Sequence, residues 1–281
     1  MNQHNTVRAR VVGPASSPDG GLRAQRSIAS LLAPLDRLAV GSSSLVPKPG
    51  ATFRVGGRTC ELPRYLFLGP TGGDDPIRIG LFAAIHGDEP EGAYALVRFL
   101  ELLEQRPELA AGYCLLVYPV CNPTGFEDGT RCSRRARDLN REFWKNSAEP
   151  EVDLLQRELV RHAFHGIVSF HTDDTSDGLY GFVAGATLTK HLIEPALESA
   201  EAVLPRNRRE VIDGFNARDG IIRDSYDGVL SAPPKARPRP FQIILEVPQR
   251  APEFAKEQAL VVALQTLLTK YRELVAFAPN L

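Results

Sequence analysis

Short apolar runs alternate with amphipathic segments along most of this chain. The continuous apolar runs predict strands at 77–85, 113–120, 166–170 and 241–247. Apolar residues at helical spacing predict helices at 90–105, 151–164, 187–204 and 253–275. Apolar strands that are separated by amphipathic helices are typical of a parallel sheet covered on both faces. We therefore expect an α/β fold with a mainly parallel (mixed) central sheet and helices on both faces.

The beginning of the chain is less regular. Residues 1–23 mix Pro, Gly, Ser and Asn without periodicity, which predicts a mobile N-terminal arm. The elements expected after it are a helix over 24–40, interrupted by Pro34, and extended segments at 52–55 and 63–68. We see no internal repeat, and we expect residues 24–281 to form a single domain.

Composition and charge narrow the class of protein. The chain has 281 residues, of which 43% are hydrophobic and 24% charged, as is ordinary for a soluble globular protein. A net charge of −1 gives no electrostatic case for nucleic acid or a membrane surface as a partner. No apolar run has the length of a signal peptide or a membrane span, and the four cysteines form no CxxC pair. These features predict a cytoplasmic protein with free thiols.

Polar residues follow the ends of three predicted strands. In parallel sheets, ligands bind outside the carboxyl ends of the strands. The first strand leads into HGDE, with His86 and Glu89; the third leads into His171; the last carries Glu246. A His/Glu/His set is the ligand type of a catalytic zinc site. Pro90 fits the first position of a helix, so Glu89 is expected in the turn between strand and helix.

Each of these residues also has a simpler interpretation. His171 alone could be a core histidine with a hydrogen-bond partner, and Glu246 could form a salt bridge at the end of its strand. His162 and His165 have ligand-like spacing too, but they fall at the end of a predicted helix, where histidines often face the helix dipole or solvent. His86 and His171 both end strands, so the expected fold brings them together.

The order of several motifs carries a family resemblance. HGDE, NPTG, GTR, DLNREF, a strand-end histidine and a glutamate on the last strand follow one another. This series resembles the zinc carboxypeptidase superfamily, which includes a succinylglutamate desuccinylase/aspartoacylase branch. The resemblance runs from about Arg78 to the C-terminus, while residues 1–75 carry no such motif. It implies a zinc-carboxypeptidase-like (phosphorylase/hydrolase-like) fold and one Zn²⁺ per chain on His86, Glu89 and His171.

The resemblance also implies roles for five further residues. Glu246 corresponds to the glutamate that deprotonates water and later protonates the leaving nitrogen. Arg131 corresponds to the arginine that polarises the scissile carbonyl. Asn140 and Arg141 correspond to the pair that binds the terminal carboxylate of the substrate. Tyr226 could correspond to a tyrosine that closes over that carboxylate, or it could be a plain surface residue.

A long polar loop is expected over 122–140, and it is rich in arginine. Arg134 is the main rival to Arg131 for the role at the carbonyl. The arginines could also form a solvated face, contact nucleic acid or widen the preference for acidic substrates. The balanced net charge and the lack of interleaved aromatic residues argue against nucleic acid.

Three aspartates beside these motifs are candidates for supporting roles. We expect Asp138, in DLNR, to orient the site rather than to react. Asp173 and Asp174 follow His171 directly and could orient its imidazole. They could also discriminate against acidic substrates near the metal.

The function that the resemblance implies is hydrolysis of an amide beside a carboxylate by metal-activated water. The expected substrate is a small peptide, cleaved by a metallocarboxypeptidase, and the alternative is an N-acyl amino acid, cleaved by a deacylase of the desuccinylase/aspartoacylase type. A long segment before His86 and little more than one helix after Glu246 favour the peptidase. A third possibility is a non-catalytic carboxylate-binding protein, but such a protein needs no general base.

Overall fold

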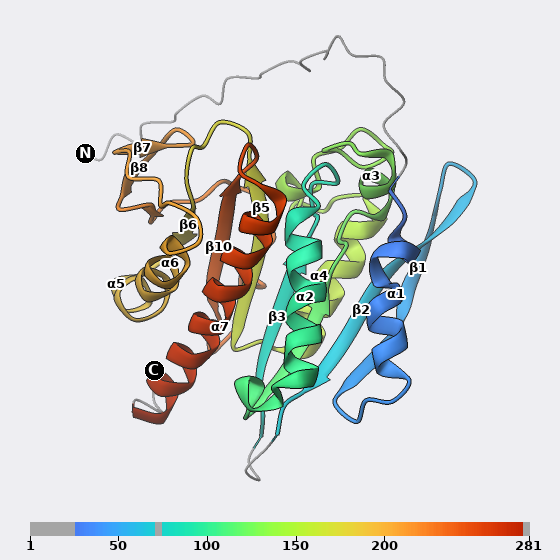
Figure 1. Ribbon diagram of the computed structural model, residues 1–281. Coiled ribbons are helices and arrows are strands. Elements are labelled where there is room, and N and C mark those ends of the chain that lie inside the picture. Colours follow the sequence, from blue (N-terminus) through green and yellow to red (C-terminus); the bar gives the residue numbers. More distant parts are fainter. Residues whose placement is uncertain (1–25, 71–74, 278–281) are drawn as a thin grey trace.

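The central feature of the fold is one mixed β-sheet (Figure 1). The computed structural model describes residues 26–70 and 75–277. Its strands lie in the order β1-β2-β4-β3-β5-β10-β6-β9-β8-β7. They are β1 (Leu45–Val55), β2 (Arg58–Leu68), β3 (Ile77–Ala83), β4 (Tyr113–Tyr118), β5 (Gly166–Asp173), β6 (Tyr180–Val183), β7 (Val211–Ile212), β8 (Phe215–Arg218), β9 (Ile221–Ile222) and β10 (Phe241–Pro248). Strands β4, β3, β5 and β10 are parallel, and β2 and β6 join them antiparallel.

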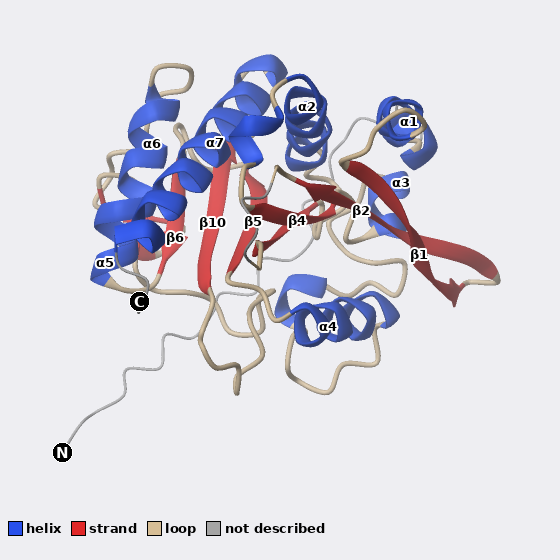
Figure 2. Cartoon of the chain, turned by 90° about the horizontal axis from the view of Figure 1, so that it is seen from below, coloured by secondary structure: helices blue, strands red, loops and turns tan. Residues whose placement is uncertain are grey.

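Helices cover both faces of the sheet. They are α1 (Ile28–Ala39), α2 (Glu91–Gln105), α3 (Pro123–Asp128), α4 (Pro150–His162), α5 (Ala186–Leu188), α6 (Glu194–Glu201) and α7 (Glu253–Phe277). Figure 2 shows α1, α2, α6 and α7 on one face and α4 on the other. The predicted α/β fold with a mainly parallel, mixed sheet and two helical layers is confirmed.

The core has one apolar layer on each side of the sheet. Successive residues of a strand point to opposite faces. Leu81 therefore packs in the layer that contains Leu264 of α7, while its neighbour Phe82 packs in the layer that contains Leu159 of α4. This double burial explains why the central strands are apolar throughout rather than alternating.

Several predicted elements differ from the observed ones. The extended segments predicted at 52–55 and 63–68 belong to a longer hairpin, β1–β2. The loop predicted over 122–140 contains α3, which begins where Asn122 caps it and Pro123 takes its first position. The helix predicted over 187–204 is divided into α5, a π-helical turn at Thr189–Ile193 and α6.

The end of β5 and the N-terminal segment are the other two regions with a specific prediction. Strand β5 runs to Asp173 rather than ending at Phe170, so His171 lies inside the strand. The mobile arm predicted at 1–23 lies outside the described residues.

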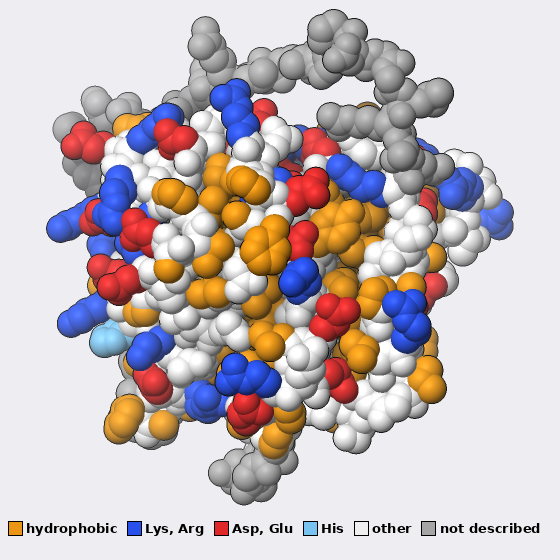
Figure 3. All heavy atoms as spheres, in the orientation of Figure 1, with side chains coloured by type: hydrophobic (Ala, Val, Ile, Leu, Met, Phe, Trp, Pro, Cys, Tyr) orange, Lys and Arg blue, Asp and Glu red, His pale blue; other side chains and the backbone are white. Residues whose placement is uncertain are grey.

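Charged side chains of both signs lie on the surface, and the cysteines are free thiols. On the face covered by α2 and α7, acidic and basic side chains are interspersed with hydrophobic ones (Figure 3). All four cysteines are free. Within residues 26–70 and 75–277, no helix has both the length and the apolar character that a membrane crossing requires.

Candidate active site

The HGDE turn is fixed to the neighbouring strand as soon as β3 ends. Ala84 has a positive φ of 49°, which turns the chain away from the strand direction. The backbone N–H groups of Cys121 and Asn122 donate to the carbonyl oxygens of Ala83 and Ala84, each at 2.9 Å. The position of His86, two residues later, is therefore set by backbone bonds to the segment after β4.

Glycine is required at position 87 because α3 lies against it. A Cβ at Gly87 would lie 2.0 Å from the carbonyl carbon of Gly125. The side chain of Asn122 caps α3 by accepting from the Gly125 N–H (2.9 Å) and donates to the Arg131 carbonyl (3.3 Å). The NPTG segment thus holds both the HGDE turn and the loop that carries Arg131.

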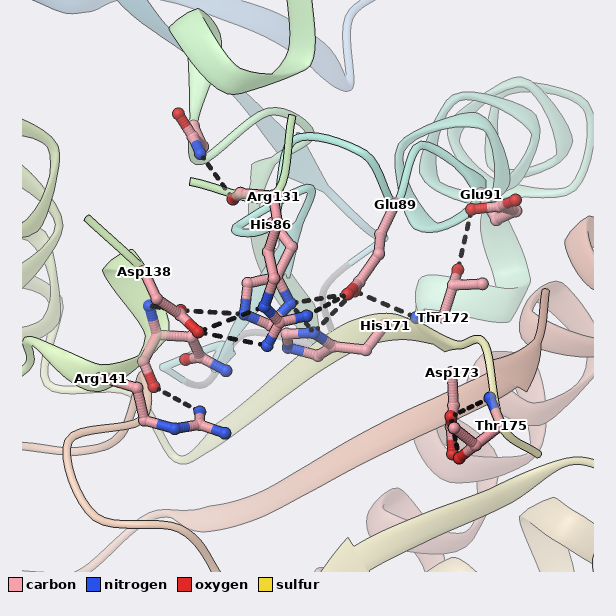
Figure 4. A network of polar contacts seen from close by, with 12 residues as sticks. His86, Glu89, Glu91, Arg131, Asp138, Arg141, His171, Thr172, Asp173 and Thr175 are labelled. Carbon is pink, nitrogen blue, oxygen red and sulfur yellow. Dashed lines mark hydrogen bonds and ion pairs between the residues drawn. The ribbon is translucent and has the colours of Figure 1, made fainter. Parts of the chain in front are cut away.

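Three potential metal ligands converge at the carboxyl ends of β3 and β5 (Figure 4). His86 Nδ1 lies 2.7 Å from Glu89 Oε1, and His171 Nδ1 lies 3.0 Å from Glu89 Oε2. One ligand atom from each residue can be chosen so that all lie within 4.8 Å of one another, and all three residues are buried. This donor set fits a divalent ion such as zinc, with room for a further ligand.

The charge states of Glu89 and His171 also suit a cation. Burial raises the pKa of Glu89, but its contacts with His86 and His171 outweigh burial and lower it, which keeps the carboxylate ionised. Burial lowers the pKa of His171, which favours its neutral, ligating form. For His86, burial also lowers the pKa, but Glu89 and Asp138 outweigh it and raise the pKa.

Asp138 orients the first imidazole, as its place in DLNR suggested. Its Oδ1 lies 3.1 Å from His86 Nε2, and its Oδ2 lies 3.2 Å from Arg131 Nη2. A carboxylate on the second nitrogen fixes the tautomer of a ligating histidine and the plane of its ring.

The corresponding suggestion for the second imidazole is wrong for Asp173. That carboxylate accepts from Tyr180 Oη (2.8 Å) and from the Thr175 N–H (2.7 Å) instead. His171 Nε2 is buried without a partner among the described residues.

Arg131, not Arg134, lies at the candidate metal site. Its Nη1 is 3.1 Å from Glu89 Oε1, so the guanidinium reaches over the ligand cluster from the Asp138 side. Arg134 instead pairs with Asp128, with Nη2 2.7 Å from Oδ2, and does not line the cavity. The structure therefore separates the two arginines that the sequence left as rivals.

Glu246 lies beside the ligand cluster with its carboxylate free. On β10 it is in register with His171 of β5 on one side and with Tyr180 of β6 on the other. Within the described part of the chain, no hydrogen bond or ion pair reaches its carboxylate. Burial, together with the negative charges of Glu89 and Asp173, raises its pKa well above the ordinary value.

Asn140, Arg141 and Tyr226 are held in place by contacts between two loops. The Arg141 guanidinium carbon lies 4.1 Å from the centre of the Tyr226 ring. Asn140 Oδ1 accepts from the Leu230 N–H (2.8 Å), and Tyr226 Oη donates to the Asp213 carbonyl (2.9 Å). These bonds tie the 226–230 loop to the segment that carries Asn140 and Arg141.

The three ligands and the five further residues to which the resemblance gave roles all line one cavity of about 240 Å³. They are His86, Glu89, Arg131, Asn140, Arg141, His171, Tyr226 and Glu246. Two guanidinium groups, of Arg131 and Arg141, face six carboxylates there. The carboxylates are those of Asp88, Glu89, Asp173, Asp174, Asp213 and Glu246.

A second cavity adjoins the first. It has a volume of about 400 Å³ and shares Phe182, Tyr226, Val229 and Ile244 with the first. Trp144 is also part of its wall, and Arg223 and Arg239 line it as well. The two cavities therefore share part of their wall.

Sequence reasoning missed some of the lining residues. Tyr180 begins the short strand β6, and Asp213 lies in the turn between β7 and β8; their neighbours in sequence give no sign of a site. The other two histidines with ligand-like spacing lie outside the cavity. His162 contacts Glu158 (3.3 Å), and His165 Nδ1 accepts from the Arg78 N–H (2.9 Å).

A family model matches the part of the chain that carries most of this site. Residues 76–205 match the succinylglutamate desuccinylase/aspartoacylase catalytic domain. That segment includes all three candidate metal ligands but not Glu246. No curated protein is similar enough in sequence to match.

Solved structures with the same fold cover most of the chain. One is a protein of Shewanella denitrificans named as a candidate metallopeptidase, with 20% identity, a TM-score of 0.70 and coverage of 90% of this chain and 91% of that one. Another is a metallo-carboxypeptidase of Pseudomonas aeruginosa in complex with (2-guanidinoethylmercapto)succinic acid, with 21% identity, a TM-score of 0.64 and coverage of 86% and 68%. A third is carboxypeptidase A of Helicoverpa armigera, with 14% identity, a TM-score of 0.66 and coverage of 91% and 75%.

At these identities, the structural likeness establishes the fold. The family match covers strands β3, β4, β5 and β6 of the sheet. The chain thus shares the carboxypeptidase-like fold, and its residues 76–205 are similar to the succinylglutamate desuccinylase/aspartoacylase catalytic domain.

Proposed function

We propose that this protein is a zinc-dependent carboxypeptidase that releases the C-terminal residue of short peptides. The observation that carries the proposal is the single cavity in which the His86/Glu89/His171 cluster, the free carboxylate of Glu246 and the Arg141 guanidinium meet. These parts suffice to hold an ion, a proton acceptor and a carboxylate-bearing substrate at once.

His86, Glu89 and His171 would hold the ion. A bound zinc ion supplies Lewis-acid polarisation of the scissile carbonyl and makes water more acidic. His86 stays oriented by Asp138, whose Oδ1 lies 3.1 Å from Nε2, so the ring does not have to reorganise.

Asn140 and Arg141 bind the terminal carboxylate of the substrate in this proposal. A guanidinium can form two parallel hydrogen bonds to a carboxylate, which fixes orientation as well as charge. Tyr226 stacks on Arg141 and so keeps the guanidinium in place. The side chain of the released residue enters the second cavity past Tyr226 and Ile244.

Glu246 carries the proton through the reaction. It accepts a proton from the attacking water as the new C–O bond forms, and it then donates that proton to the amide nitrogen as the C–N bond breaks. The products are a shortened peptide and an amino acid. Burial and the nearby carboxylates raise the pKa of Glu246, which makes it a stronger proton acceptor than an ordinary carboxylate.

Arg131 stabilises the negative charge that develops on the carbonyl oxygen. Its guanidinium already reaches the ligand cluster, 3.1 Å from Glu89 Oε1. A preorganised cationic donor at that point stabilises the transition state more than a mobile one, because it does not have to reorient during the reaction.

The charge of the cavity favours peptides over N-acyl acidic amino acids. Six carboxyl groups and two guanidinium groups line the cavity, so acidic side chains outnumber basic ones there. Asp173 lies on the side of the site away from Arg141 (Figure 4), where the acyl part of the substrate lies in this proposal. A free ammonium group is attracted there, whereas a second carboxylate is repelled.

The second candidate is an N-acyl-amino-acid deacylase. The match of residues 76–205 to the desuccinylase/aspartoacylase domain favours it. Both candidates use the same ligands, base and carboxylate-binding pair, so the acyl side of the substrate is what distinguishes them.

Amine release from a matched panel decides between the two. The panel holds dipeptides with a free ammonium group and N-acetyl or N-succinyl forms of the same C-terminal residues, assayed with and without a chelator. We expect chelator-sensitive release from the dipeptides, restored by zinc. Release from the N-acyl compounds alone would support the deacylase, and no release from any member after zinc addition would refute hydrolysis.

A further inference from the structure

Helix α7 buries a lysine near the candidate metal site. Lys256 is 3% exposed, and its Nζ donates to Glu91 Oε1 at 2.5 Å and to the Gln249 carbonyl at 3.2 Å. Burying an ammonium group away from water costs free energy unless ion pairs and hydrogen bonds replace its contacts with water. This ion pair therefore needs an explanation beyond general stability.

The partner of Lys256 is connected to the ligand cluster. Glu91 begins α2, and its Oε2 accepts from Thr172 Oγ1 at 2.8 Å (Figure 4). Thr172 follows His171 on β5, and its backbone N–H donates to Glu89 Oε2 at 3.1 Å. We call the three residues Lys256, Glu91 and Thr172 the buried tether.

We infer that the buried tether positions the metal ligand Glu89 and thereby sets the metal affinity of the site. This inference rests on the proposed function, because it takes His86, Glu89 and His171 as the ligands. Thr172 is held through both its hydroxyl and its backbone, so its N–H fixes one carboxylate oxygen of Glu89. The other oxygen, Oε1, contacts His86 Nδ1 and Arg131 Nη1.

The start of α2 packs closely against β5. A Cβ at Gly92 would lie 2.5 Å from Cβ of Phe170 on β5, so the start of α2 touches the strand directly. Small shifts of β5 are therefore transmitted to Glu89 and His171 together. Groups that orient metal ligands typically change metal affinity by about 10- to 100-fold when they are removed.

A purely mechanical clamp between α2 and α7 is the competing interpretation. The same two helices share a second ion pair, Arg98–Glu257, at 3.9 Å, with the Arg98 side chain half exposed. Among the described residues, neither side chain of that pair is bonded to β5. If the pairs only clamp the helices together, removing either one should have the same effect on zinc affinity. If the tether positions Glu89, only removal of the Lys256–Glu91 pair should lower zinc affinity.

Three variants of the full chain separate these roles. Thr172→Val removes only the hydroxyl and keeps the backbone N–H. Glu91→Leu with Lys256→Met replaces the ion pair by apolar side chains and leaves no unpaired charge. Arg98→Met with Glu257→Leu is the matched control on the same helices. The readouts are the zinc dissociation constant, from competition with a chelator, and the melting temperature of the metal-free protein.

Positioning predicts that zinc affinity falls about 10- to 100-fold in the first two variants and stays at wild type in the control. It also predicts that adding Thr172→Val to the Glu91/Lys256 variant causes little further loss, because the tether is already broken. If the Glu91/Lys256 variant does not fold, Thr172→Val alone decides.

Wild-type zinc affinity in Thr172→Val would overturn the inference while leaving the proposed function intact. Equal losses in all variants, in step with their melting temperatures, would also overturn it. Failure of the wild-type protein to bind zinc would instead refute the proposed function and, with it, the role of the tether.

Discussion

Glu246 has a carboxylate that no described residue binds, and in our account it carries the proton transfers. Glu246→Gln keeps the size of the side chain but removes the proton acceptor. We expect kcat to fall about 10²- to 10⁴-fold, the usual contribution of a general acid or base. Zinc affinity should stay near wild type, because Glu246 is not one of the proposed ligands. Both quantities can be measured on one preparation, and undiminished turnover would contradict the mechanism.

Arg141 lines the cavity and Arg134 does not, so Arg134 serves as a control for substitution of Arg141. Arg141→Ala should raise KM roughly 10- to 100-fold, because a hydrogen bond to a charged group is worth about 1.5–3 kcal/mol. Arg134→Ala loses only its ion pair with Asp128 and should leave KM unchanged. Steady-state kinetics on one dipeptide gives both values, and equal effects would remove Arg141 from the binding role.

Single residues could be nominated from the sequence where a motif fixed their spacing. His86 and Glu89 are three positions apart, and DLNR brings Asp138, Asn140 and Arg141 in one turn. Asp213 could not be found in this way. It reaches the cavity only because a short hairpin, with φ of 51° at Asp213 itself, folds back over the site.

The turn after β3 depends on close contact with α3. Gly87→Ala would place a Cβ 2.0 Å from the Gly125 carbonyl carbon and force the two segments apart. We expect a loss of about 1–3 kcal/mol in the free energy of unfolding, as for other overpacked sites, together with weaker zinc binding.

Gly41→Ala is the control for that experiment, because a Cβ there meets nothing within 4 Å. Urea unfolding of the metal-free proteins measures both variants. A Gly87→Ala protein as stable as Gly41→Ala would contradict the packing argument.

Elements with long periodic patterns were predictable, and short ones were not. Helices α2, α4 and α7 and the central strands carry enough apolar residues at regular spacing to be recognised. Strands β6 and β9 have four and two residues, too few for a pattern, and pairing with β10 and with each other holds them. The length of β5 was underestimated because His171 and Asp173, which are polar, belong to the strand.

At the scale of the whole molecule, α4 is joined to the sheet by Glu158. This carboxylate accepts hydrogen bonds from Tyr118 (2.6 Å) on β4 and from Arg64 on β2. Burial raises the pKa of Glu158, but the bonds from His162, Tyr118 and Arg64 outweigh it and lower the pKa to about 2.

This shift predicts a specific acid sensitivity. Since the folded pKa lies below the unfolded one, the stabilisation is complete above pH about 4.5 and is lost as pH falls toward about 2. Glu158→Gln should therefore flatten the fall of the melting temperature across that window. Scanning calorimetry at several pH values measures it, and parallel curves for wild type and variant would show that Glu158 does not contribute.

The central claim is that the cluster of His86, Glu89 and His171 holds a metal ion. Elemental analysis of the purified protein, after addition of zinc and dialysis, tests this most directly. The account predicts about one zinc ion per chain, as for a three-ligand catalytic site, and none in a His86→Ala/His171→Ala variant that keeps its circular dichroism spectrum. A wild-type protein without stoichiometric zinc, or a double variant that retains it, would contradict the account.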